Sequence, residues 1–168
     1  MQKCSSRNYA FIDGQNLREG LMQSGLLMDY KLFRKYLSMK HCVVKAFLYI
    51  GYIKKNEALY KFLRSAGFNL VFKEVIEGGG RVKGNVDALM VADAMDKLCK
   101  NEFDKAVVVT SDGDFAPLIE QLQEKGKFKL LISPKKETCS ILLKKRVAGQ
   151  VRYISDFIHK VKRRSADT

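Results

Sequence analysis

Proline is scarce in this sequence, and long apolar runs are missing from it. Only two of the 168 residues are proline, and apolar residues make up 46% of the chain against 29% charged residues, which excludes an intrinsically disordered chain. No apolar stretch reaches about 18 residues, the length that a membrane-spanning helix needs. Residues 1–7 are polar and lack the apolar centre of a secretory signal. We therefore expect a globular protein with no membrane partner.

Acidic residues are also few relative to basic ones. The chain has 31 lysines and arginines against 18 aspartates and glutamates, so its formal net charge is +13. Such a charge favours anionic partners, either nucleic acid or an acidic membrane surface. A general excess of solubilising charge is the alternative interpretation.

Cysteine and histidine are both sparse. The four cysteines are far apart, and none forms a CxxC pair or stands at metal-ligand spacing from a histidine: Cys4, Cys42, Cys99 and Cys139. We interpret all four as free thiols, which predicts a cytoplasmic location. With only two histidines, acid–base catalysis by a histidine pair is disfavoured. The GxxxxGKS/T, GxGxxG and GxSxG motifs of nucleotide-binding loops and nucleophile elbows do not occur where those folds need them.

Short apolar runs alternate with longer stretches at helical spacing. The runs predict strands at residues 9–12, 43–50, 70–75, 106–110, 129–132 and 151–154, and the longer stretches predict helices at 16–24, 29–39, 55–66, 86–99, 115–125, 138–145 and 155–161. This alternation predicts an α/β fold, a doubly wound parallel sheet with helices on both faces. We expect a single domain, residues 1–168, with a core from about 8 to 133 and a basic C-terminal segment, 134–168.

Four aspartates stand at the ends of predicted strands or at the start of a predicted helix. The first strand ends in Asp13-Gly14-Gln15-Asn16, the fourth ends in Thr110-Ser111-Asp112-Gly113-Asp114, and Asp87 begins the helix after a glycine-rich loop, residues 77–84. Ligands of doubly wound sheets bind beyond the carboxyl ends of the strands, where the strand order reverses. If the two strands are neighbours there, these carboxylates meet at one edge.

Each aspartate also has a purely structural explanation. Asp13 can be a helix N-cap, Asp112 and Asp114 can form a turn and a cap, and Asp87 can complement a helix dipole. A shared site accounts for all of them together. Because clustered carboxylates repel one another, that site predicts raised pKa values or a bound hard cation, Mg²⁺ or Mn²⁺. Such an ion supports phosphodiester hydrolysis.

Three segments in order resemble the motifs of NYN domains, a PIN-like nuclease family that includes the LabA-like proteins. They are residues 8–16 (NYAFIDGQN), residues 83–87 (KGNVD) followed by Asp93, and residues 110–115 (TSDGDF). The similarity extends from about residue 8 to about residue 133. It implies a Rossmann-like sheet of strand order 3-2-1-4-5 with metal at its carboxyl edge. One departure is Ser111, where the family usually has glycine.

The resemblance also implies roles for individual residues. The catalytic and metal-binding residues are Asp13, Asp87, Asp112 and Asp114, and we place Asn16, Arg81, Lys83 and Ser111 at the substrate, with the two cations holding phosphate. We also expect Ser111 to form hydrogen bonds within its loop. Asp93 lies about 240° around the helix from Asp87, so we predict a structural role for it.

Together these residues predict a metal-dependent ribonuclease that uses Mg²⁺ or Mn²⁺, an endonuclease rather than an exonuclease. Its partner would be nucleic acid, and the preference for RNA over DNA rests on the resemblance alone. The alternative is a PIN-like module that binds RNA or a protein without cutting. The presence of all four aspartates favours the enzyme hypothesis, since a site that no longer cut RNA would tolerate the loss of a carboxylate that repels its neighbours. The sequence leaves open whether the chain is a homodimer and whether its basic C-terminal segment contacts substrate.

Overall fold

The computed structural model describes residues 4–73 and 86–162. Its strands are β1 (Asn8–Asp13), β2 (Val43–Gly51), β3 (Asn69–Lys73), β4 (Ala106–Val109), β5 (Phe128–Ser133) and β6 (Val151–Tyr153). They form one parallel sheet in the order β3-β2-β1-β4-β5-β6. The predicted α/β fold class is confirmed. The predicted strand order is incomplete, because β6 extends the sheet beyond β5.

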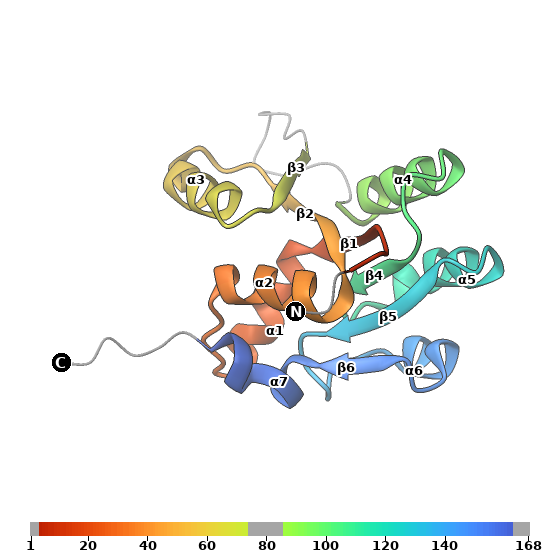
Figure 1. The fold of residues 1–168 in the computed structure, drawn as a ribbon. Coiled ribbons are helices and arrows are strands. Elements are labelled where there is room, and N and C mark those ends of the chain that lie inside the picture. The colour runs from red at the N-terminus through yellow and green to blue at the C-terminus, as the bar shows by residue number, and fades with distance from the viewer. Residues whose placement is uncertain (1–3, 74–85, 163–168) are drawn as a thin grey trace, which may run out of the picture.

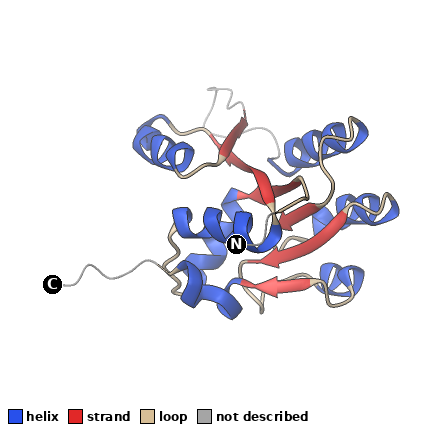
Figure 2. Cartoon of the chain, viewed as in Figure 1, coloured by secondary structure: helices blue, strands red, loops and turns tan. Residues whose placement is uncertain are grey.

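Helices cover both faces of the sheet (Figures 1 and 2). The helices are α1 (Gly14–Gln23), α2 (Tyr30–His41), α3 (Glu57–Ser65), α4 (Val86–Cys99), α5 (Ala116–Glu124), α6 (Ile141–Val147) and α7 (Ile154–Val161), with short 3₁₀ turns η1 (Lys54–Asn56) and η2 (Gly113–Phe115). One apolar layer joins the sheet to α1, α2, α3 and α7. The other joins it to α4, α5 and α6.

The central strands are apolar on both faces because both are covered. Every residue of β1 and β4 is buried. Along β1, Tyr9 and Phe11 contribute to the layer beneath α4 and α5, whereas Ala10 and Ile12 contribute to the layer beneath α1 and α2. This alternation of side chains is the normal geometry of a strand, and it explains why the sequence shows continuous apolar runs rather than an apolar–polar pattern.

Several element boundaries differ from the predicted ones. The helix predicted at 16–24 begins at Gly14, because the Asp13 carboxylate accepts the Asn16 N–H and caps the helix two residues earlier. The helix predicted at 138–145 begins at Ile141, since the Ser140 N–H donates instead to the Ser111 carbonyl. The strand predicted at 70–75 is described only as far as Lys73; residues 74 and 75 lie outside the described ranges.

The expectation of four free thiols is wrong, because Cys4 and Cys42 form a disulfide. The chain before β1 runs beside the end of α2, where the Asn8 side chain donates a hydrogen bond to the His41 carbonyl over 2.7 Å. The two cysteines are 38 residues apart in sequence, so their spacing alone did not indicate the pairing. A disulfide is typical of oxidising compartments. The cytoplasmic location thus loses its cysteine argument and stays a prediction.

Membrane spanning has no support in the described part of the chain. No helix within residues 4–73 and 86–162 combines the length and the apolar character needed to cross a bilayer.

Gly14 stands where α1 begins directly against the end of β2. A Cβ atom at this position would lie 2.3 Å from Ile50 Cγ2 and 2.8 Å from the Tyr49 carbonyl oxygen. The second of these is a backbone atom that a side-chain rotation cannot move. The absence of a side chain therefore allows α1 to start immediately after Asp13.

We predict that Gly14→Ala lowers the free energy of unfolding by about 1–3 kcal/mol, because the added methyl group overpacks the junction of α1 and β2. Urea unfolding followed by circular dichroism measures the change. Gly51→Ala is the matched control, since a Cβ atom there meets nothing within 4 Å, and its effect should stay within about 0.5 kcal/mol. Equal stabilities of the two variants would contradict the packing argument.

Candidate functional site

A groove crosses the carboxyl edge of the sheet at the point where the strand order reverses. β1 continues into α1 on one face, whereas β4 leads through η2 to α5 on the other face. Chains that diverge from neighbouring strands leave a crevice between them. We call this space, of about 1610 Å³, the edge groove: its lining comes from the carboxyl ends of β1, β2 and β3, from α1 and α3, and from Asp87 and Asp112.

Asp13 is the most buried carboxylate of the edge groove, with 4% of its surface exposed. Its Oδ1 accepts the Asn16 N–H over 3.0 Å, and its Oδ2 accepts the Thr110 hydroxyl over 3.4 Å. The predicted N-cap role is therefore real. The same carboxylate also lines the edge groove, so Asp13 both caps α1 and contributes to the candidate site.

Thr110 joins the two acidic segments. Its hydroxyl donates to Asp13 and accepts the Asp112 N–H over 3.1 Å, and the side chain is fully buried. Sequence reasoning missed this residue as part of the site. The signal that could have found it is a hydroxyl at the end of a buried strand, directly before an acidic loop.

Asn16 and Ser111 form a second link between the same loops. The Asn16 Oδ1 accepts the Ser111 N–H over 2.8 Å. The Ser111 hydroxyl lies 3.0 Å from that of Ser133 and is buried, as expected of a loop hydrogen-bonding residue. Asn16 and Asp112 line both the edge groove and a smaller neighbouring cavity of about 310 Å³, whereas Ser111 lines only the smaller cavity.

The remaining predicted aspartates occupy different positions. Asp87, in the first turn of α4, and Asp112, the N-cap of η2, both line the edge groove. Asp114 is exposed, does not line the groove, and donates its N–H to the Asp112 carboxylate over 3.0 Å. The structure thus brings Asp13, Asp87 and Asp112 to one surface, with Asp114 beside them. Arg81 and Lys83 lie outside the described residues.

The electrostatics of Asp13 reflect its neighbours. Burial, more than any other cause, raises the pKa of Asp13 from its usual 3.8 to about 6, and the negative charges of Asp87 and Asp112 add to the rise. Hydrogen bonds from Asn16 and Thr110 act in the opposite direction. Within the described ranges, no three side chains of His, Cys, Asp and Glu form a compact metal-binding group. Asp13, Asp87 and Asp112 therefore line the same groove without forming such a group among the described residues.

We predict that Asp13→Asn stabilises the metal-free protein at pH 7 by on the order of 2 kcal/mol, with little effect at pH 4. A raised pKa means that the folded protein binds the Asp13 proton more tightly than the unfolded chain does. The destabilisation of the folded protein by ionised Asp13 is therefore absent below about pH 4. It grows between about pH 4 and about pH 6 and is complete above about pH 6. Chemical denaturation in EDTA at both pH values measures it.

Asp29→Asn, at the N-cap of α2 outside the edge groove, controls for the loss of a capping carboxylate. A loss of stability on Asp13→Asn at pH 7 would mean that capping outweighs burial and repulsion.

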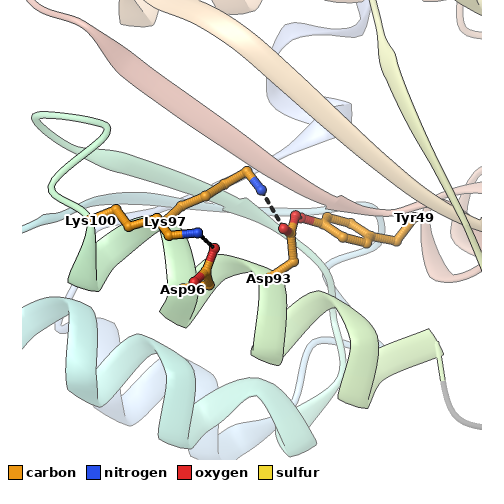
Figure 3. Close-up of polar contacts among 5 residues, drawn as sticks. All are labelled: Tyr49, Asp93, Asp96, Lys97 and Lys100. Atoms are coloured by element: carbon orange, nitrogen blue, oxygen red, sulfur yellow. Dashed lines mark hydrogen bonds and ion pairs between the residues drawn. The ribbon is translucent and has the colours of Figure 1, made fainter.

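A buried polar contact attaches α4, and with it Asp87, to the sheet. Figure 3 shows Asp93 between Tyr49 and Lys97: the fully buried Tyr49 donates its hydroxyl to Asp93 Oδ2 over 2.5 Å, and Lys97 forms an ion pair with Asp93. The Lys97 ammonium also lies 4.7 Å from the ring centroid of Phe47. Burial raises the pKa of Tyr49, as does the carboxylate that accepts its hydrogen bond. These contacts agree with the structural role predicted for Asp93.

The position of this contact matters for the site. Tyr49 is the register partner of Asp13 on the neighbouring strand, and Asp93 belongs to the same helix as Asp87. The Tyr49–Asp93 hydrogen bond therefore connects the helix that carries one groove carboxylate to the strand beside another.

We predict that Tyr49→Phe lowers the free energy of unfolding by about 1.5–3 kcal/mol, the usual contribution of a hydrogen bond to a charged group. Thermal and urea unfolding measure the loss. The matched control is Tyr52→Phe, which removes a similar hydroxyl–carboxylate bond to Glu57 at an exposed position and should change stability by less than about 0.5 kcal/mol. An equally small effect at Tyr49 would show that Lys97 alone holds Asp93.

Comparisons with known proteins concern the fold and the family of this chain. Among solved structures, the chain is similar to a protein of unknown function from Vibrio parahaemolyticus, with a TM-score of 0.73 and 24% identity over 97% of this chain and 100% of that one. At this identity the likeness shows a shared fold. A comparison with curated proteins found no match. The family model of the NYN domain, part of the PIN-like nuclease superfamily, matches residues 8–148. This chain belongs to the NYN domain family.

Proposed function

We propose that this protein is a metal-dependent ribonuclease that hydrolyses RNA phosphodiester bonds at the edge groove. The observation that carries the proposal is the meeting of three carboxylates from separate elements on one surface: Asp13 at the end of β1, Asp87 on α4 and Asp112 before η2. Asp13 is close enough to the other two for their charges to raise its pKa. Members of the PIN-like nuclease superfamily generally use divalent metal ions.

The donor set fits a hard cation. All three groups are carboxylates, which Mg²⁺ and Mn²⁺ prefer, and their mutual repulsion is relieved by positive charge. Mg²⁺ usually binds through one or two carboxylates and keeps several waters, so an open arrangement suits it. When bound, such an ion polarises a phosphoryl oxygen and lowers the pKa of a coordinated water.

Each residue of the site would then have its own role. Asp13, Asp87 and Asp112 would hold the ion, directly or through its waters, and the Thr110 hydroxyl links the Asp13 carboxylate to the Asp112 backbone N–H. Asn16 lines the groove beside Asp13 and is a candidate to contact substrate. Asp114 is proposed to act from the rim, where it is exposed to incoming phosphate and water. The phosphate-holding roles of Arg81 and Lys83 stay predictions.

Charge supports a nucleic acid substrate. A phosphodiester can approach a carboxylate cluster only when a cation lies between them, whereas the net charge of +13 attracts the polyanion to the rest of the surface. RNA rather than DNA, and internal rather than terminal cleavage, are proposed from the family resemblance.

We predict that Asp112→Asn abolishes metal-dependent cleavage of labelled single-stranded RNA while the protein stays folded. The change keeps the size of the side chain and an oxygen that can accept the Asp114 N–H, but removes one charge from the metal site. Without added metal the variant should melt at the same temperature as wild type or higher, because repulsion is relieved. It should also lose most of the stabilisation that wild type gains from Mn²⁺.

Asp96→Asn is the matched control, because Asp96 is an exposed aspartate of α4 that pairs with Lys100 and does not line the groove. It should cleave as wild type does. If the Asp112→Asn variant cleaves at the wild-type rate, Asp112 acts only as the N-cap of η2. Wild-type protein that binds RNA but cuts neither RNA nor DNA with Mg²⁺ or Mn²⁺ would favour a binding module.

A further inference from the structure

The edge groove has a second end, formed by aromatic side chains rather than carboxylates. Tyr52 follows β2, Phe72 lies on β3, and Tyr60 lies on α3; all three line the groove. Their ring centroids are 5.7 Å apart for Tyr52 and Tyr60, 5.4 Å for Tyr52 and Phe72, and 4.8 Å for Tyr60 and Phe72. The proposed hydrolysis uses none of these rings.

Hydrogen bonds hold the aromatic end in a fixed shape. The Tyr60 hydroxyl accepts the Ile53 N–H over 2.8 Å and donates to the Gly51 carbonyl over 3.3 Å, which fixes the backbone on both sides of Tyr52. The Tyr52 hydroxyl donates to Glu57 over 2.6 Å. Even so, 41% of Tyr52 is exposed. The groove therefore offers the surface of a ring whose orientation is set before anything binds.

Cations surround these rings. Lys54 and Lys73 line the same part of the groove, and Arg18 lines it from α1. The Arg64 guanidinium lies 5.5 Å from the ring centroid of Phe72. Aromatic rings interleaved with lysine and arginine suit a ligand that has both a flat π-system and negative charge. Unpaired nucleotides combine the two.

We propose that Tyr52, supported by Tyr60 and Phe72, is a nucleobase subsite that stacks an unpaired base of single-stranded RNA. This rests on the proposed function, since it places the base next to the phosphate that would be cut. β3, β2 and β1 are neighbours in the sheet, and strands are about 4.8 Å apart, so the aromatic end lies roughly 10 Å from Asp13. That separation suits the base of a neighbouring nucleotide, with Lys54 close to its backbone.

A base-stacking subsite at Tyr52 would also select among substrates. A base within a duplex is paired and stacked on its neighbours, so it cannot offer a free face to Tyr52. Ile53 and Leu59, both exposed apolar residues of the groove lining, would add contact area beside the base. Binding should therefore depend on the presence of bases and on their being unpaired, and not on phosphate charge alone.

The test measures binding in EDTA by fluorescence anisotropy, so that no cleavage takes place. The probes are a short labelled oligoadenylate, an abasic ribose-phosphate chain of the same length, and the oligoadenylate paired with oligouridylate. Wild type should bind the oligoadenylate about tenfold or more tightly than the abasic chain, in line with the contribution of one stacked base. The duplex should bind no better per phosphate than the abasic chain.

Variants locate the subsite. Tyr52→Leu should remove most of the preference for the base-containing probe, whereas Tyr52→Phe should keep it, because the ring remains when the bond to Glu57 is lost. Phe62→Leu is the matched control: Phe62 is 39% exposed on α3 but does not line the groove. Melting curves establish that each variant is folded.

Two outcomes would overturn the proposal: equal wild-type affinity for the oligoadenylate and the abasic chain, or an unchanged preference in Tyr52→Leu. The first comparison needs no variant. A wild-type dimer in sedimentation that Tyr52→Leu dissociates would also overturn it, because a second copy would then cover the groove. Failure of the nuclease proposal is seen separately, as absent cleavage with Mn²⁺ while the base preference in EDTA persists.

Discussion

β1 and β4 pair in parallel at the centre of the sheet, from Tyr9 opposite Ala106 to Ile12 opposite Val109. Both strands are buried on both faces, so their positions are set by packing, and the chain leaves them in opposite directions. The acidic loops that follow are therefore side by side, and the Thr110 hydroxyl and the Asn16 amide fasten them together. Two of the groove carboxylates, Asp13 and Asp112, take their places from this pairing.

Much of this arrangement could be predicted from the sequence. Apolar runs located the strands, and the two acidic motifs follow strands that an α/β fold brings together, so Asp13 and Asp112 were expected at one edge. Asp93 was correctly separated from Asp87 by helical geometry alone. These predictions succeed because they depend on local periodicity and on one rule of strand order.

Other features depend on contacts between distant segments. The Cys4–Cys42 disulfide needs the N-terminal segment beside the end of α2, and the Thr110 bridge needs the exact register of two loops. The aromatic end joins Tyr52 and Tyr60 to Phe72 on the edge strand β3, and no motif marks it. Spacing along the chain contains none of this information, since each contact is set by how the helices and strands pack.

The Tyr49–Asp93 contact also gives Asp87 a different support from that of the other carboxylates of the groove. It holds α4 at Asp93, and Asp87 stands about 9 Å nearer the N-terminus of that helix, at 1.5 Å per residue. The buried Met90 lies between them on the helix and belongs to the core beneath α4. Asp13 and the backbone of Asp112, in contrast, are joined by the Thr110 hydroxyl. The acidic end of the groove thus has two separate supports: the pairing of β1 with β4 places Asp13 and Asp112, and the packing of α4 against β2 places Asp87.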